Sequence, residues 1–186
     1  MQNNIINLTK QQLVDLQACP EGIDFFNKIA PSGELNIEMT SWLFLMLSSS
    51  KYIGNWAWWL QEKNIISNIE IKNECLISAD LSEAMFKNIT FFNCNFHGAN
   101  LENAEFSKCK LTYCDFVSAN LSRANLSNSN LKMTNFVNAD LSDADLSGTN
   151  LNEAVLYYAN LNWAYYPEGI LPKDWQRNSD GYLISE

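Results

Sequence analysis

Large apolar residues recur at every fifth position through the second half of the chain. Between residues 119 and 151 the spacing has no slip, and the apolar positions are Leu121, Leu126, Leu131, Phe136, Leu141, Leu146 and Leu151. An α-helix turns about 100° per residue, so a period of five spreads apolar side chains around the whole cylinder. In a flat strand the same residues would alternate between the two faces. The period therefore predicts a solenoid, in which one short unit recurs along an axis.

Small residues form a second pattern, because one of them stands two positions before nearly every large residue. In every fourth unit the pair is an alanine followed by a leucine, with the alanines at Ala79, Ala99, Ala119, Ala139 and Ala159. The units thus recur in groups of four. This predicts twenty-residue coils with four unlike faces, in which each residue lies over the one twenty positions earlier. Ile89 occupies a small-residue position, and we expect it to cause a bulge or a gap on its face.

The units resemble those of a known family. Segments such as "ADLSE", "ANLEN", "ANLSR", "ADLSD" and "ANLNW" are similar to the units of pentapeptide-repeat proteins, and the resemblance covers residues 69–166. It implies a right-handed quadrilateral parallel β-helix, with four units per coil and the small and large residues pointing inward. Five coils at the inter-strand spacing of ~4.8 Å would form a rod about 24 Å long.

The two ends of such a rod need covers, because each end has an unpaired edge and an open apolar core. At the C-terminal end, Asp180-Gly181 lies between short apolar runs and predicts a type I′ hairpin. We expect residues 167–186 to form this short hairpin cap, with Trp175, Tyr182 and Leu183 over the last coil.

Residues 1–68 have a helical pattern. Thr9 and Gln12 match a capping box, which predicts a helix that ends at Cys19. Further helices are predicted from Pro20 to Pro31 and over residues 39–49 and 51–63. This N-terminal helical module is either a lid on the first coil or a module that recruits a partner. The predicted fold class is α+β: the helical module at 1–68, the β-helix at 69–166 and the cap at 167–186.

Composition favours a folded acidic protein. Hydrophobic residues make up 47% of the 186 residues and charged residues only 18%. The net charge of −9 and the pI near 4.6 argue against direct nucleic-acid binding. "MQNNIINLTK" has no features of a signal peptide, and the apolar window around residues 42–60 is broken by three serines and Lys51. We therefore expect a cytoplasmic protein without membrane association, with its five cysteines reduced.

The sequence offers little enzymatic chemistry, and no catalytic residue, metal site or cofactor is predicted. His97 is the single histidine, and the chain has no glycine-rich nucleotide loop. Asp140, Asp143 and Asp145 are spaced so that they fall on different faces, which favours a plain acidic surface over a calcium or acid–base site. Cys94 and Cys114 would lie one coil apart, as core thiols or, less simply, as a disulfide.

One set of outward positions is apolar where most others are polar. This candidate binding stripe consists of Phe92, His97, Tyr113, Val117, Met133, Val137, Tyr157 and Tyr158. Either the helical module of the same chain covers it, or it binds a protein partner or a second copy of the chain as a homodimer.

A second surface feature is acidic. No lysine or arginine lies between Lys132 and Lys173, and the candidate acidic pole in this interval consists of Asp140, Asp143, Asp145 and Glu153. Some pentapeptide-repeat proteins resemble B-form DNA in width and charge and bind DNA gyrase, which the resemblance makes an alternative function here. The mimic would be sparse, because many outward residues are asparagines. The first prediction is thus a non-enzymatic protein-binding scaffold, and a DNA mimic that inhibits or protects gyrase or another DNA-binding enzyme is the second.

Overall fold

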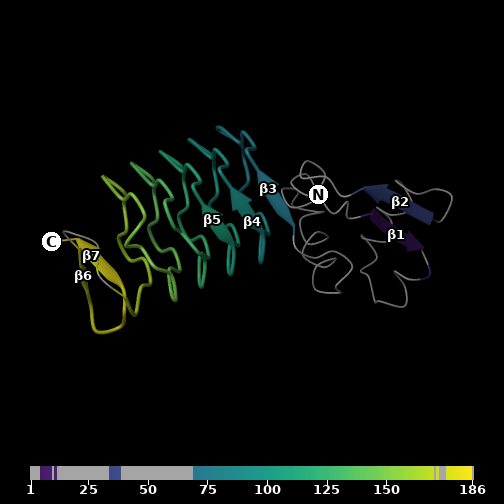
Figure 1. Cartoon of the computed structure of the whole chain (residues 1–186). Coiled ribbons are helices and arrows are strands. Elements are labelled where there is room, and N and C mark those ends of the chain that lie inside the picture. The colour runs from purple at the N-terminus through teal and green to yellow at the C-terminus, as the bar shows by residue number, and fades with distance from the viewer. Residues whose placement is uncertain are drawn as a thin grey trace. The chain divides into compact units, whose positions relative to one another are not determined.

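The chain divides into two compact units, Met1–Ser67 and Asn68–Glu186, in a computed structural model (Figure 1). The structure describes residues 5–9, 11, 34–38, 69–169, 171 and 175–185. The two units are described separately.

The described part of the first unit contains a strand pair that the helical prediction missed. β1 (Ile5–Thr9) pairs with β2 (Glu34–Glu38) in antiparallel register, so that Ile6 lies opposite Ile37. "ELNIE" alternates apolar and polar residues with a period of two, and "IINLT" does so from Ile6 onward, which is the strand pattern. The purely helical assignment is therefore wrong at these ten residues, and Thr9 ends a strand. The predicted helices lie outside the described residues, apart from Gln11, which is helical. These are the helix up to Cys19, the helix from Pro20 to Pro31, and the helices over 39–49 and 51–63.

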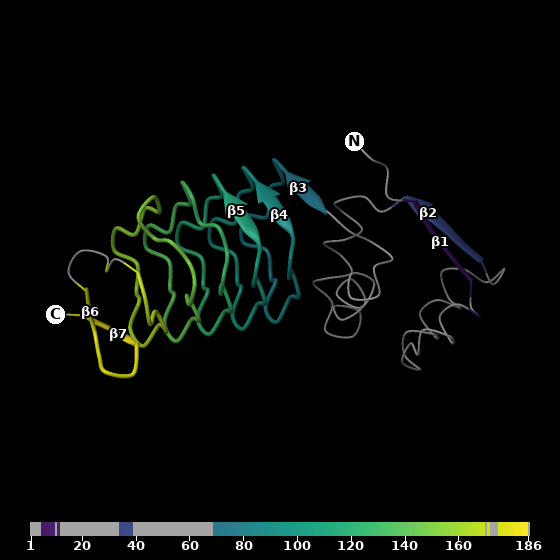
Figure 2. The same cartoon turned by 60° about the horizontal axis from the view of Figure 1, so that its bottom comes forward.

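The second unit is a solenoid of stacked twenty-residue coils (Figure 2). Parallel β-bridges join residues exactly one coil apart in four columns, as in the series Asp80, Asn100, Asn120, Asp140 and Asn160. Leu101 and Leu121 are both fully buried, and the N–H of Leu101 donates to the carbonyl of Asn120 at 2.7 Å. The stacking predicted from the twenty-residue period is confirmed.

Each five-residue unit has the same internal structure, for example Ala119-Asn120-Leu121-Ser122-Arg123. The small and large residues point into the core, the mid-face residue between them lies outside, and two corner residues turn the chain. The N–H of Ala124 donates to the carbonyl of Leu121 at 3.0 Å and closes a β-turn. Arg123, the second corner residue, has a φ of 59°.

Mid-face asparagines and aspartates stabilise these corners. The Oδ1 of Asn120 accepts a hydrogen bond from the N–H of Ser122 at 3.1 Å, and Asp140 does the same for Ser142 at 3.0 Å. Side chains of this kind satisfy a backbone donor two residues on, which supports a turn. Many outward Asn and Asp residues are thus explained by local structure.

One face of the rod contains the regular strands. β3 (Glu70–Lys72), β4 (Thr90–Phe92) and β5 (Lys110–Thr112) form a parallel sheet whose register advances by twenty residues at each step. Ile69 and Ile89 occupy the small-residue position here and are both buried without a shift in register. The bulge expected at Ile89 is therefore wrong. β-branched side chains suit the extended backbone of this face.

The disruption falls instead on the last coil of the same face. Asn130 forms a bridge with Lys110 but none with Asn150. The N–H of Met133 donates to the carbonyl of Glu153, twenty positions on, whereas the N–H of Tyr113 donates to Lys132, nineteen positions on. The register of the hydrogen bonds thus shifts by one residue at Glu153, and it returns at Val155, which lies opposite Asn135.

Aromatic residues fill the core of the adjacent face. Phe96 and Phe116 stack with ring centroids 4.6 Å apart and an interplanar angle of 2°, and Phe116 and Phe136 follow at 5.3 Å and 14°. All three side chains are fully buried. This face and its continuation into the last coil carry much of the candidate binding stripe.

A hairpin covers part of the last coil. β6 (Trp175–Arg177) and β7 (Leu183–Ser185) pair antiparallel. Leu183 is fully buried, Trp175 is half-buried and Tyr182 is exposed at the rim. A hairpin lies where the sequence predicts it, but the type I′ assignment is wrong. A type I′ turn needs two central residues with positive φ, and in this connection only Gly181 has one (90°). The connection spans five residues, 178–182, and Asn178 Oδ1 accepts hydrogen bonds within it from the N–H groups of Asp180 and Tyr182.

Candidate functional site

The candidate binding stripe occupies two neighbouring corners of the rod. Phe92, Tyr113 and Met133 lie at the corner that follows the β3–β5 face, and we call them the first row. His97, Val117, Val137, Tyr157 and Tyr158 lie at the next corner, and we call them the second row. The repeat brings residues from successive coils together, because equivalent residues such as Tyr113 and Met133 stack. Phe92 is equivalent to Thr112 and lies beside Tyr113. Phe92 contacts Tyr113 edge to face, with ring centroids 5.5 Å apart.

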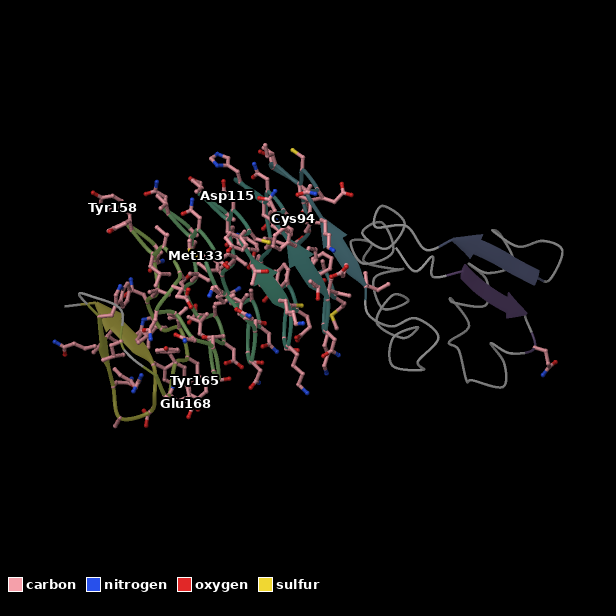
Figure 3. All side chains as sticks on the ribbon, viewed as in Figure 1. Cys94, Asp115, Met133, Tyr158, Tyr165 and Glu168 are labelled. Carbon is pink, nitrogen blue, oxygen red and sulfur yellow. The ribbon has the colours of Figure 1, made fainter. Side chains whose placement is uncertain are left out.

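The side chains of both rows reach solvent within the described unit. Tyr157 is 74% exposed and Tyr158 is 87% exposed, and Phe92, Tyr113, Met133 and His97 are also classed as exposed. Val117 and Val137 are half-buried. Figure 3 shows Tyr158 at the outer rim of the last coil, while Cys94 lies inside the rod.

The structure adds two residues to the stripe, and neither of them was predicted from the sequence. Ile77 occupies the second row one coil before His97, and Val155 is the mid-face residue of the last coil. Both are exposed. A signal existed for Val155, since the equivalent positions are Asn95, Asp115 and Asn135, and an aliphatic residue there leaves the corner without its side-chain acceptor.

The candidate acidic pole is distributed over separate columns. Asp140 Oδ1 accepts hydrogen bonds from Ser142 and from Asn160 Nδ2, and Asp145 Oδ1 accepts from the N–H of Ser147 at 2.9 Å. Glu153 lies beside the first row, where its carboxylate pairs with Lys132 Nζ at 3.3 Å. Asp143 is an exposed corner residue. The described coils therefore do not gather the four carboxylates into one cluster.

Within the described residues no group of three or more His, Cys, Asp and Glu side chains has the arrangement of a metal site. His97 stays exposed at its corner. The same described ranges contain no helix that is long and apolar enough to cross a bilayer.

Buried thiols replace alanine in two columns of the core. Cys94, Cys109 and Cys114 are free and buried, whereas Cys75 in the first coil is free and exposed. Cys109 Sγ donates to the carbonyl of Phe86 at 2.8 Å, and burial raises the pKa of this thiol to about 12. The hydrogen bond with Cys94, together with burial, also raises the pKa of Cys114. Cys109 and Cys114 are therefore poor nucleophiles that fill the core. The same hydrogen bond with Cys114 lowers the pKa of the buried Cys94.

The coils form a rod whose interior is mostly apolar and whose outward residues vary from unit to unit. A family model for pentapeptide repeats matches the chain in overlapping segments at residues 75–112, 91–132, 104–143 and 134–165. Residues 75–165 belong to the pentapeptide-repeat family. The stacked coils, the inward small and large residues and the positive-φ corners of this pentapeptide-repeat domain follow from that repeat.

Solved pentapeptide-repeat structures are similar to this chain. A plasmid-mediated fluoroquinolone resistance protein, QnrB1, is 24% identical over 56% of this chain and 54% of its own, with a TM-score of 0.44. A protein from the Arabidopsis thaliana thylakoid lumen is 24% identical over 60% of this chain and 74% of its own, with a TM-score of 0.39. HetL, from Nostoc and involved in heterocyst differentiation regulation, is 23% identical over 57% of each chain, with a TM-score of 0.23.

These likenesses carry no argument about partners, because the matched region spans only about half of QnrB1 and the sequences have diverged. No curated protein sequence matches the chain.

Proposed function

We propose that the chain is a non-enzymatic scaffold that binds a protein partner through the candidate binding stripe. The proposal rests on one observation: two rows of apolar side chains stay exposed on a rod whose interior is closed and whose other corners are mostly polar. Contiguous exposed apolar surface of this kind is typical of interaction sites. The aromatic members Tyr113, Tyr157 and Tyr158 are of the residue type that often dominates binding energy.

Rigidity is the physical basis of the proposed mechanism. The stacked phenylalanines and the inter-coil hydrogen bonds fix the backbone under each stripe residue, so the side chains are displayed without a large ordering cost on binding. Specificity would come from the outward residues alone, because the inward residues are set by the repeat.

The test compares two double variants of the full chain. Val117→Asp with Val137→Asp places two carboxylates in the second row. Ser127→Asp with Ser147→Asp adds the same charge at the equivalent positions of the opposite corner, which are also half-buried. We expect the first variant alone to lose its partner in affinity capture from the native host, with both variants equally folded by circular dichroism. If both retain the same partners, the stripe is not the binding surface.

Light scattering of the full chain distinguishes other occupants of the stripe. A mass twice that of the monomer, lost in the Val117→Asp and Val137→Asp variant, would assign the stripe to a homodimer. A monomer whose unfolding temperature falls only in that variant would indicate that residues 1–67 cover the stripe.

The DNA-mimic alternative is supported by the net charge of −9. Residues 69–166 contain eleven carboxylates and six basic side chains. Arg123 pairs with Glu102 and Lys132 with Glu153, which reduces the negative potential that a mimic needs. A gyrase supercoiling assay at low and high salt tests it: inhibition or protection at micromolar protein that weakens with salt would favour mimicry over the scaffold. The cytoplasmic location stays a prediction.

A further inference from the structure

Among the described residues, no strand pairs with the edge of the last coil from Glu153 to Leu156. Within the described part of the chain, the N–H groups of Glu153 and Leu156 and the carbonyl of Ala154 find no backbone partner. One coil earlier the equivalent groups are all bonded. The N–H of Phe136 donates to Val155 at 2.7 Å, and the carbonyl of Thr134 accepts from the N–H of Val155 at 2.9 Å. The backbone donors and the backbone acceptor of this edge are therefore available to an added strand.

The apolar core is open at the same place. Leu156 and Ala154 are half-buried, whereas the residues stacked beneath Leu156, which are Phe96, Phe116 and Phe136, are fully buried. On the next face of the last coil Ala159 and Leu161 are buried. The opening is thus confined to the face from Glu153 to Leu156.

The C-terminal hairpin shows what fits such an edge. On another face of the last coil, the N–H of Leu183 donates to the carbonyl of Ala164 at 2.8 Å, and the N–H of Tyr166 donates to the carbonyl of Gly181 at 2.8 Å. Tyr165 and Tyr182 form the antiparallel bridge between these bonds. Ala154 and Leu156 hold the same two positions in their unit as Ala164 and Tyr166 in theirs. Figure 3 shows Tyr165 and Tyr158 on different sides of the last coil.

We infer that the edge from Glu153 to Leu156 accepts an extended peptide segment of another protein as an added antiparallel strand. The inference rests on the proposed binding function and names the partner's chemistry. The first residue of a three-residue core would accept from the N–H of Leu156, and the third would donate to the carbonyl of Ala154, as Gly181 and Leu183 do on their face.

The surroundings define the segment further. Its third side chain lies over the open core and is apolar, as Leu183 is. Its first residue is a glycine, because it takes the place of Gly181, where a Cβ would lie 3.1 Å from Pro167 Cα. Its second side chain points outward beside Val155, in the place that Tyr182 takes beside Tyr165. Glu153 is already paired with Lys132, and Val155, Tyr157 and Tyr158 are uncharged, so an uncharged segment fits best. The edge is continuous with the end of the second row, where Tyr157 and Tyr158 contribute further apolar surface.

The experiment uses the full chain and a synthetic probe, the capped heptapeptide Ser-Thr-Gly-Tyr-Leu-Thr-Lys with a fluorophore on its lysine. We expect binding with a Kd of about 10–100 µM by fluorescence anisotropy. Amide hydrogen exchange should slow at least about tenfold over residues 153–158 with bound probe and stay unchanged over residues 133–138, one coil earlier.

The matched control is the same peptide with an N-methyl group on the leucine. It keeps every side chain and removes the N–H that donates to Ala154, so we expect binding at least about tenfold weaker. Equal binding of the two peptides, protection elsewhere on the rod, or no binding at about 1 mM overturns the inference.

The Val117→Asp and Val137→Asp variant separates this inference from the proposed function. It should bind the probe as the parent chain does. If the parent chain fails to bind the probe while partner capture still depends on the second row, the strand-addition inference fails and the scaffold proposal stands. If the probe binds but partner capture does not depend on the second row, the strand-addition inference stands and the proposal that the stripe binds the partner fails.

Discussion

The middle coils and the last coil are built from the same five-residue unit, but their core residues differ in burial. Phe116 and Phe136 lie between coils on both sides and are fully buried, whereas Leu156, in the same column, has a coil on one side and is half-buried. The inter-coil hydrogen bonds are regular up to residue 130 and then shift by one residue at Glu153. Burial in a solenoid therefore depends on the neighbours of a unit as well as on its own residues.

The largest expected effect is the difference in unfolding free energy when a core residue is truncated in a middle coil or in the last coil. Phe116→Ala should lower the free energy of unfolding by about 4 kcal/mol, because it leaves a cavity between two stacked rings. Leu156→Ala should cost only about 1 kcal/mol, since part of that side chain is already in water. Urea unfolding of the two variants measures the difference. Equal losses would show that the last coil is as closed as the middle ones.

The next effect concerns the cap, which closes one face of the last coil. A Cβ on Gly181 would lie 3.1 Å from Pro167 Cα and 3.1 Å from Tyr165 Cε2, at a φ of 90°. Gly181→Ala should therefore destabilise the cap by about 2 kcal/mol and speed amide exchange at Tyr166 and Leu183.

Gly98→Ser is the control for that variant. Gly98 has a φ of 62°, but a Cβ there meets only Ser78 Oγ at 3.5 Å. Serine occupies the equivalent corner at Ser78 and Ser118 with φ values of 55° and 57°. We expect the control to lose less than about 1 kcal/mol. A larger loss from Gly98→Ser than from Gly181→Ala would contradict this account of the cap.

A pH titration probes the closed core of the middle coils. The folded pKa of Cys109 is about 12 against an ordinary value of 9.0, so the folded state retains the proton more strongly than the unfolded state. The associated stability is present below about pH 9 and is lost as the pH rises toward 12, by about 1.4 kcal/mol per pH unit at most. Cys109→Ser, which copies Ser129 in the same column, should reduce this slope in urea unfolding between pH 8.5 and about 10.5. An unchanged slope would assign the alkaline loss to other groups.

The smallest effect is expected at the local register shift of the last coil. Lys132 and Glu153 are both about half exposed, so their ion pair is screened by solvent. Lys132→Gln should change the free energy of unfolding by less than about 0.5 kcal/mol, with little dependence on salt. A loss above about 1 kcal/mol would mean that this pair holds the shifted register in place.

The period of five and the four-unit super-period were sufficient to predict the stacked coils and the inward residues, and Asp180-Gly181 predicted the position of the C-terminal hairpin. These features depend on local repetition, because a unit that recurs every five residues must place equivalent side chains in equivalent surroundings. Most of the candidate binding stripe could be read in the same way, since its residues are the apolar exceptions at outward positions.

The tertiary structure alone decided the rest. Ile89 fits without a bulge because Ile69 lies beneath it on an extended face, while the hydrogen-bond register shifts locally at Glu153, where only one coil is in contact. Asp140 and Asp145 turned out to accept hydrogen bonds at their corners, and Glu153 to pair with a lysine. The strand pair of residues 5–9 and 34–38 links segments far apart in the sequence. A repeat specifies what each residue does within its own unit, but pairing across coils and at the ends depends on which segments meet in space, and a single sequence does not state that.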